Sequence, residues 1–139
     1  MSDKDILELL RSRRADFLTI LGGEVKDFNS SPPELKMQFD VGKEFCHSGG
    51  KIIQGGFITV MLDAPMAHLL IALLDSKFTP MTLDINVSFL GPSHPGKLIC
   101  HAKILKLGKS IAYLSSELYQ KEKLVATATS TIKLVPISD

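Results

Sequence analysis

The fold is decided by the stretch from Lys51 to Leu74, which reads Lys-Ile-Ile-Gln-Gly-Gly-Phe-Ile-Thr-Val-Met-Leu-Asp-Ala-Pro-Met-Ala-His-Leu-Leu-Ile-Ala-Leu-Leu. From Phe57 to Leu74, 14 of 18 residues are apolar, which predicts a helix that is hydrophobic on every side. Such a helix has to be covered by other structure. Because it carries Asp63, Pro65 and His68 and has no flanking basic cluster, we interpret it as a buried central helix rather than a membrane span.

Asp63 is the candidate catalytic residue of this helix. A carboxylate in apolar surroundings costs several kcal/mol unless it has hydrogen-bond donors, a positive partner or a raised pKa, so its presence needs an explanation. His68 lies five residues further on and points about 140° away around the helix. The two side chains therefore do not form a ready-made acid and base pair.

Gly55 and Gly56 stand at the predicted start of the helix. Glycines at this place let free backbone N–H groups approach a carbonyl oxygen or an anion, which makes them candidates for an oxyanion hole. Eight residues of helix separate Gly55 from Asp63 by about 12 Å, too far for both to act on one carbonyl. If both act, the acid comes from a second chain, which predicts a homodimer with a shared site.

Composition narrows the class of protein. The 139 residues carry a net charge of +1, from 16 basic and 15 acidic side chains, and predict one domain over residues 1–139 without nucleic acid or membrane as a partner. The two cysteines, Cys46 and Cys100, are too few for a disulfide framework, and the N-terminus lacks the layout of a signal peptide. We expect a soluble protein of the cytoplasm. The cysteines and histidines show no spacing typical of metal ligands, so no metal site is expected.

The remaining segments predict an antiparallel sheet. A first helix beginning at Ser2 or Asp3 and ending at Gly22 is followed by a hairpin of strands near residues 24–28 and 34–40. After the central helix, residues 82–89 alternate strictly between apolar and polar side chains, which is typical of a half-buried strand. Strands near residues 98–106, 111–119 and 124–134 then form a meander. The fold class is α+β, with a curved antiparallel sheet around one long helix plus an N-terminal helix.

The segments Gln54-Gly-Gly-Phe57, Asp63, Thr82-Leu-Asp-Ile-Asn-Val-Ser-Phe-Leu90 and Pro95-Gly96 together resemble the hotdog-fold thioesterases of the PaaI type. The resemblance covers residues 21–135. It implies an acyl-CoA thioesterase that works as a homodimer or a dimer of dimers, with coenzyme A present only as part of the substrate and no other cofactor. Exposed cations such as Lys106 or Lys109 would then meet the phosphates of coenzyme A.

The resemblance also implies roles for single residues. Gly55 would donate its N–H to the thioester oxygen, and Asp63 of the neighbouring chain would be the general base or the nucleophile. Thr82 matches a hydroxyl that positions water, and Gln54 stands where the family commonly has histidine.

In this comparison, Gly56 completes the glycine pair at the substrate. The family usually has an asparagine seven residues before the first glycine, and here Ser48 holds that place with His47 beside it. Either of the two could face the substrate. Two alternatives remain open: a non-catalytic acyl-CoA binding module of the same fold, and a hotdog dehydratase.

Overall fold

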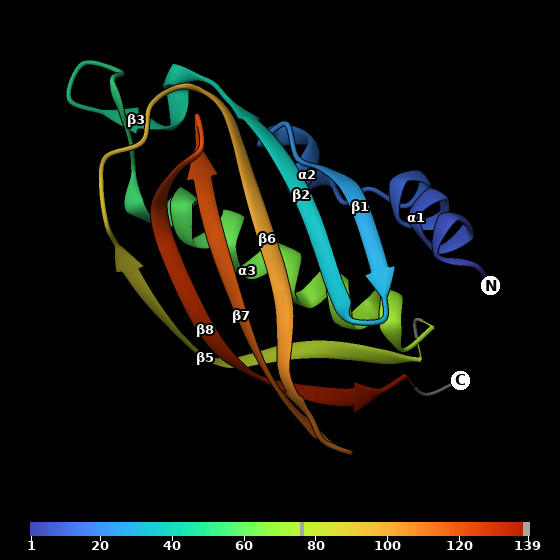
Figure 1. Cartoon of the computed structure of the whole chain (residues 1–139). Coiled ribbons are helices and arrows are strands. Elements are labelled where there is room, and N and C mark those ends of the chain that lie inside the picture. Colours follow the sequence, from blue (N-terminus) through green and yellow to red (C-terminus); the bar gives the residue numbers. More distant parts are fainter. Residues whose placement is uncertain (76, 138–139) are drawn as a thin grey trace.

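The computed structural model describes residues 1–75 and 77–137, and its main feature is a six-stranded sheet that curves around one long helix (Figure 1). The strands of the sheet are β1 (Glu24–Ser30), β2 (Pro33–Val41), β5 (Phe78–Phe89), β6 (Gly96–Leu107), β7 (Ile111–Gln120) and β8 (Lys123–Pro136). Their order across the sheet is β1-β2-β6-β7-β8-β5, and every neighbouring pair is antiparallel. The α+β arrangement predicted from the sequence, including the early hairpin and the final meander, is confirmed.

The central helix is α3 (Gly55–Leu73), which packs against the inner face of the sheet and runs behind the strands in Figure 1. Met61, Leu62, Met66 and Leu69 are completely buried there. The helix continues without a break through Pro65, and although it is long and apolar enough to cross a membrane by length and composition alone, it forms the core of the fold.

One side of α3 is less buried than its sequence predicts. Val60, Ala67 and Ile71 recur at helical spacing and are only partly buried within a single chain. The uniform hydrophobicity of the segment is therefore not matched by uniform burial, because one sheet can cover only one side of a helix.

The N-terminal segment forms two helices instead of the single predicted one. Helix α1 (Asp3–Ser12) begins with Ser2, whose side chain accepts a hydrogen bond from the Asp5 N–H, as expected for a capping residue. A second, short helix, α2 (Asp16–Ile20), carries Phe17, which is 45% exposed and does not continue the apolar face of α1. Apolar residues recur at helical spacing on both sides of the break between α1 and α2, so the sequence pattern did not reveal the break.

A short hairpin joins β2 to the central helix. The 3₁₀ turn η1 (Lys43–Phe45) leads into β3 (Cys46–His47), which pairs with β4 (Ile52–Ile53). The Gln54 N–H then donates to the Phe45 carbonyl at 3.0 Å. This hairpin therefore ties residues 46 and 47 closely to the first residue of α3.

Strand β5 lies at the edge of the sheet and contains a β-bulge. Its register with β8 shifts between Thr82 and Asp84, so Leu83 is the additional residue. The β5 residues that lie opposite buried residues of β8 are Pro80 opposite Leu134, Thr82 opposite Ile132, Ile85 opposite Ser130, Val87 opposite Ala128 and Phe89 opposite Ala126. The strict alternation in the sequence predicts Thr82 on the other face from Ile85. The bulge overturns that prediction and turns Thr82 toward α3.

Candidate active site

The start of α3 exposes one backbone donor. Gln54 is the N-cap, and its side-chain oxygen accepts a hydrogen bond from the Gly56 N–H at 2.6 Å. The N–H groups of Phe57 and Ile58 donate to the Gln54 carbonyl. In the part of the chain that the structure describes, the Gly55 N–H has no acceptor. Of the two glycines, Gly55 is therefore the one whose donor is free at the positive end of the helix dipole.

A cleft of about 230 Å³ lies beside Gly55. Its lining is mainly apolar and includes Ile53, Ile58, Phe89 and Val125, with His47 as a polar member. The ring of Phe89 lies against Gly55, because a Cβ placed at residue 55 would come within 3.2 Å of the ring carbon Cζ. Glycine at this position lets the helix start and the aromatic ring approach each other.

Asp63 lies further along the same helix, beside Thr82 in the first half of β5. The Thr82 hydroxyl donates to Asp63 Oδ1 at 3.0 Å, and the carboxylate is half-buried rather than enclosed. Residues 63 and 82 were both predicted as site residues, and the structure brings them together. Oδ2 has no hydrogen-bond partner among residues 1–75 and 77–137, so it is available to accept a proton or attack a carbon.

The structure distinguishes His47 from Ser48, either of which could face the substrate according to the sequence. His47 lines the cleft beside Gly55, whereas Ser48 does not. The two side chains are joined by a hydrogen bond of 2.8 Å between His47 Nδ1 and Ser48 Oγ. His47 is therefore the residue of this pair that faces the candidate substrate cleft.

Other titratable groups near the helix are placed for structural roles. His68 is mostly buried, its Nδ1 donates to the Ala64 carbonyl at 2.8 Å, and burial lowers the pKa of its side chain, with that hydrogen bond partly offsetting the shift. Burial raises the pKa of the Cys46 thiol, with a smaller contribution from Glu44, and burial raises the pKa of Cys100 to about 12. Neither thiol is thus activated as a nucleophile.

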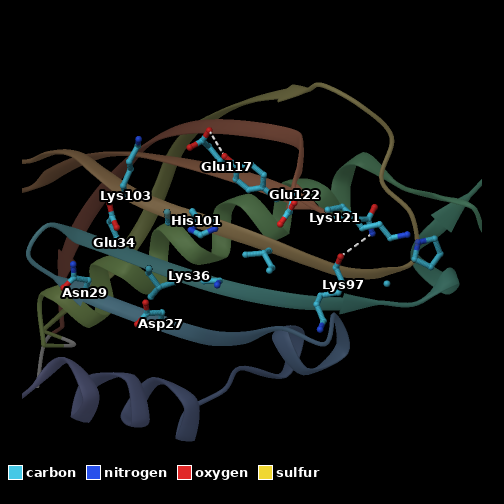
Figure 2. A pocket seen from close by; sticks show the side chains of 17 residues that line it. Asp27, Asn29, Glu34, Lys36, Lys97, His101, Lys103, Glu117, Lys121 and Glu122 are labelled. Atoms are coloured by element: carbon cyan, nitrogen blue, oxygen red, sulfur yellow. Dashed lines mark hydrogen bonds between the residues drawn. The ribbon is translucent and has the colours of Figure 1, made fainter.

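A larger groove, of about 970 Å³, lies on the face of the sheet turned away from α3 (Figure 2). Its lining comes from β1, β2, β6, β7 and the adjoining turns, with acidic and basic side chains intermingled, such as Lys36, His101 and Glu117. None of the seven predicted site residues lines it. Size alone therefore does not select the candidate site, and the smaller cleft is the candidate because it adjoins the free Gly55 N–H.

Comparison with known proteins identifies the family. The thioesterase superfamily matches residues 50–127, which include α3, β5, β6 and β7. The chain belongs to the thioesterase superfamily.

Individual relatives agree with this assignment. A solved structure from Ralstonia eutropha, provisionally named a thioesterase and a phenylacetic acid degradation-related protein, is 31% identical, with 92% of this chain and 98% of that chain covered and a TM-score of 0.84. A thioesterase structure from Haemophilus influenzae shares the fold at 18% identity and a TM-score of 0.83, with 100% and 94% covered. A protein of Pseudomonas aeruginosa, provisionally named an esterase, is 24% identical over 102 residues, or 73% of this chain and 75% of its own. The chain is thus a hotdog-fold thioesterase of the PaaI type, and its chemistry is thioester hydrolysis.

Two features of this thioesterase were not found from its sequence. Phe89, the last residue of β5, was taken only as an apolar strand residue, and the sequence gives no sign that it meets Gly55. Thr59 donates its hydroxyl to the Gly55 carbonyl at 2.9 Å, and its spacing of four residues was the available signal. Both residues hold the backbone that carries the free N–H.

The capping role of Gln54 predicts different effects of two substitutions on stability. Gln54→Ala removes the acceptor for the Gly56 N–H and should lower the free energy of unfolding by about 1 kcal/mol. Gln54→Glu retains an acceptor at the positive end of α3 and should keep wild-type stability, measured by urea unfolding. Equal stability of the alanine variant and the wild type would contradict the capping role. Loss of thioester hydrolysis in the stable glutamate variant would show that the amide N–H groups also meet the substrate.

Proposed function

We propose that the protein hydrolyses acyl-CoA thioesters at a site formed by two copies of the chain. The observation that carries the proposal is that the free Gly55 N–H and the Asp63 carboxylate lie beside two different parts of one edge strand, β5. Gly55 contacts Phe89, the last residue of β5, whereas Asp63 accepts a hydrogen bond from Thr82, the fifth residue of that strand. A single chain therefore holds both halves of the machinery without bringing them together.

The exposed edge of β5 suggests how the halves meet. Among the described residues, no strand pairs with its outer side, and Leu83 and Phe89 are 56% and 57% exposed in the isolated chain. Two β5 strands could pair antiparallel about a two-fold axis at Ile85. Residues of one chain that face the α3 side of the sheet would then lie opposite residues of the other chain that face the same side. Thr82 of one chain would then lie beside the segment of the other chain that ends at Phe89. Asp63 would approach the partner's Gly55 by the same symmetry.

The proposed reaction uses the carboxylate and the helix start together. Asp63 removes a proton from a water molecule that attacks the thioester carbon or, in the second route, attacks that carbon itself and forms an anhydride that water then cleaves. In both routes the thiolate of coenzyme A departs and the carbonyl oxygen gains negative charge. The Gly55 N–H and the dipole of α3 would stabilise that charge, and the Thr82 hydroxyl would hold the carboxylate in place.

The substrate class completes the proposal. Coenzyme A enters only as part of the substrate, and the chemistry described needs no further cofactor. Lys106, near the end of β6, and Lys109, in the turn that follows, are exposed and are the cations we assign to the phosphates of coenzyme A. Both cysteines are free thiols, which suits the reducing cytoplasm.

Thiol release from a panel of acyl-CoA substrates tests the proposal. Asp63→Asn should lower kcat by about 10²- to 10⁴-fold with substrate binding retained, because the amide cannot accept the proton. Gly55→Pro should lower it by about 10²- to 10³-fold, because proline suits the first position of a helix but has no N–H. Gly55→Ala is the matched control, since it introduces the Cβ near Phe89 but keeps the donor.

The outcomes distinguish the candidate functions. Binding of acyl-CoA without turnover by the wild type would favour the non-catalytic module. Equal loss in Gly55→Ala and Gly55→Pro would mean that space beside Phe89, and not the N–H, limits the reaction.

The dimer proposed here predicts a separate result. Leu83→Lys puts a charge at the exposed edge of β5 in both copies and should shift the protein toward monomer in analytical ultracentrifugation, with a parallel loss of thiol release. Leu105→Lys, at a residue that is 58% exposed on β6, should leave both unchanged. A fully active Leu83→Lys monomer would rule out the shared site.

A further inference from the structure

The backbone holds His47 beside the proposed oxyanion site. His47 pairs with Ile52 in the β3–β4 hairpin, and Ile53 and Gln54 then lead directly to Gly55. The Lys51 N–H donates to the His47 carbonyl at 3.1 Å and closes the hairpin turn. The imidazole and the Gly55 N–H consequently border the same cleft in the same chain.

Ser48 has a backbone conformation that is unusual for its residue type. Its φ is +56°, and the two residues that follow, Gly49 and Gly50, also have positive φ. Only Ser48 among the three has a side chain, at a cost of about 1–2 kcal/mol for the left-handed conformation. Adjacent side chains normally point apart in an extended segment, but this turn brings the Ser48 hydroxyl back to the His47 ring at 2.8 Å. Backbone strain at a residue whose side chain also makes a hydrogen bond points to a functional constraint.

The hydrogen bond between Ser48 and His47 allows either neutral form of the ring, because a hydroxyl can also accept from an Nδ1–H group. A hydroxyl can donate to Nδ1, and then the neutral imidazole carries its hydrogen on Nε2. His68 and His94 are different, because their Nδ1 atoms bond to the carbonyls of Ala64 and Lys51, which can only accept. In the part of the chain that the structure describes, nothing bonds to His47 Nε2. When the Ser48 hydroxyl is the donor, the Nε2–H group of His47 is free to donate to another molecule.

We propose that Ser48 is a positioning residue that orients His47, so that the Nε2–H group acts beside the Gly55 N–H as a second donor to the thioester oxygen. This inference rests on the proposed function and deepens it. The ring hydrogen bonds to the carbonyl oxygen as that oxygen gains charge in the tetrahedral intermediate, and no proton is transferred from it. Ser48 acts through the ring and does not contact the substrate.

Nitrogen NMR of the histidine side chains gives a test that does not depend on activity. In the full-length protein, two-bond nitrogen–proton correlations should report hydrogen on Nε2 for His47 and on Nδ1 for His68 and His94. Ser48→Gly relieves the backbone and removes the hydroxyl, so the Nδ1 resonance of His47 should move to the position of an unbonded ring. Hydrogen on Nδ1 of His47 in the wild type would overturn the inference.

Kinetics with an acyl-CoA substrate provide the second measurement. His47→Ala should lower kcat by about 100-fold, as for loss of one oxyanion donor, with little change in KM. Ser48→Gly should lower kcat by about ten- to a hundredfold, because a displaced donor loses most of its effect. His101→Ala is the control, since His101 is exposed on the outer face of the sheet in Figure 2.

Failure of the role of Ser48 can be told apart from failure of the proposed function. Turnover by the wild type with an unchanged kcat in Ser48→Gly would overturn the role of Ser48 and leave the proposed function intact. Absence of thiol release by the wild type from every acyl-CoA in the panel would overturn the proposed function and this inference together.

Discussion

The structure depends on the rigidity of one helix. Gly55 and Asp63 belong to α3, and eight residues of α-helix hold their backbones about 12 Å apart. No rotation of side chains within one chain can close that distance. A free N–H at the helix start and an acid two turns later can meet at one carbonyl only if each works with its counterpart in another molecule.

Strand β5 suggests how two copies of the chain could assemble to bring these groups together. It is the edge of the sheet next to α3, and it contacts the helix at the two functional places, through Phe89 and through Thr82. An edge strand with exposed apolar residues readily pairs with another strand. Here the pairing surface and the proposed reactive groups lie on the same element, so association would cover the edge and complete the site in one step.

The elements that carry strong periodicity could be predicted from the sequence. The apolar run of α3 and the alternation in β5 gave the core helix, the strand and the positions of Gly55 and Asp63. The bulge at Leu83 could not be predicted, because a one-residue register shift depends on the ladder with β8, and it is this shift that turns Thr82 toward Asp63. The half-buried state of Asp63 likewise depends on tertiary packing, since composition showed an apolar helix but not which side the sheet leaves uncovered.

Mixing two inactive variants tests the shared site most directly. Asp63→Asn and Gly55→Pro chains, each nearly inactive alone, are unfolded, mixed in equal amounts and refolded together. Random association makes half of the dimers mixed, and one of the two sites in each mixed dimer has both Asp63 and the Gly55 N–H, so the account predicts about one quarter of wild-type thiol release. Activity no greater than the sum of the two separate variants, with mixed dimers present by native mass spectrometry, would contradict it.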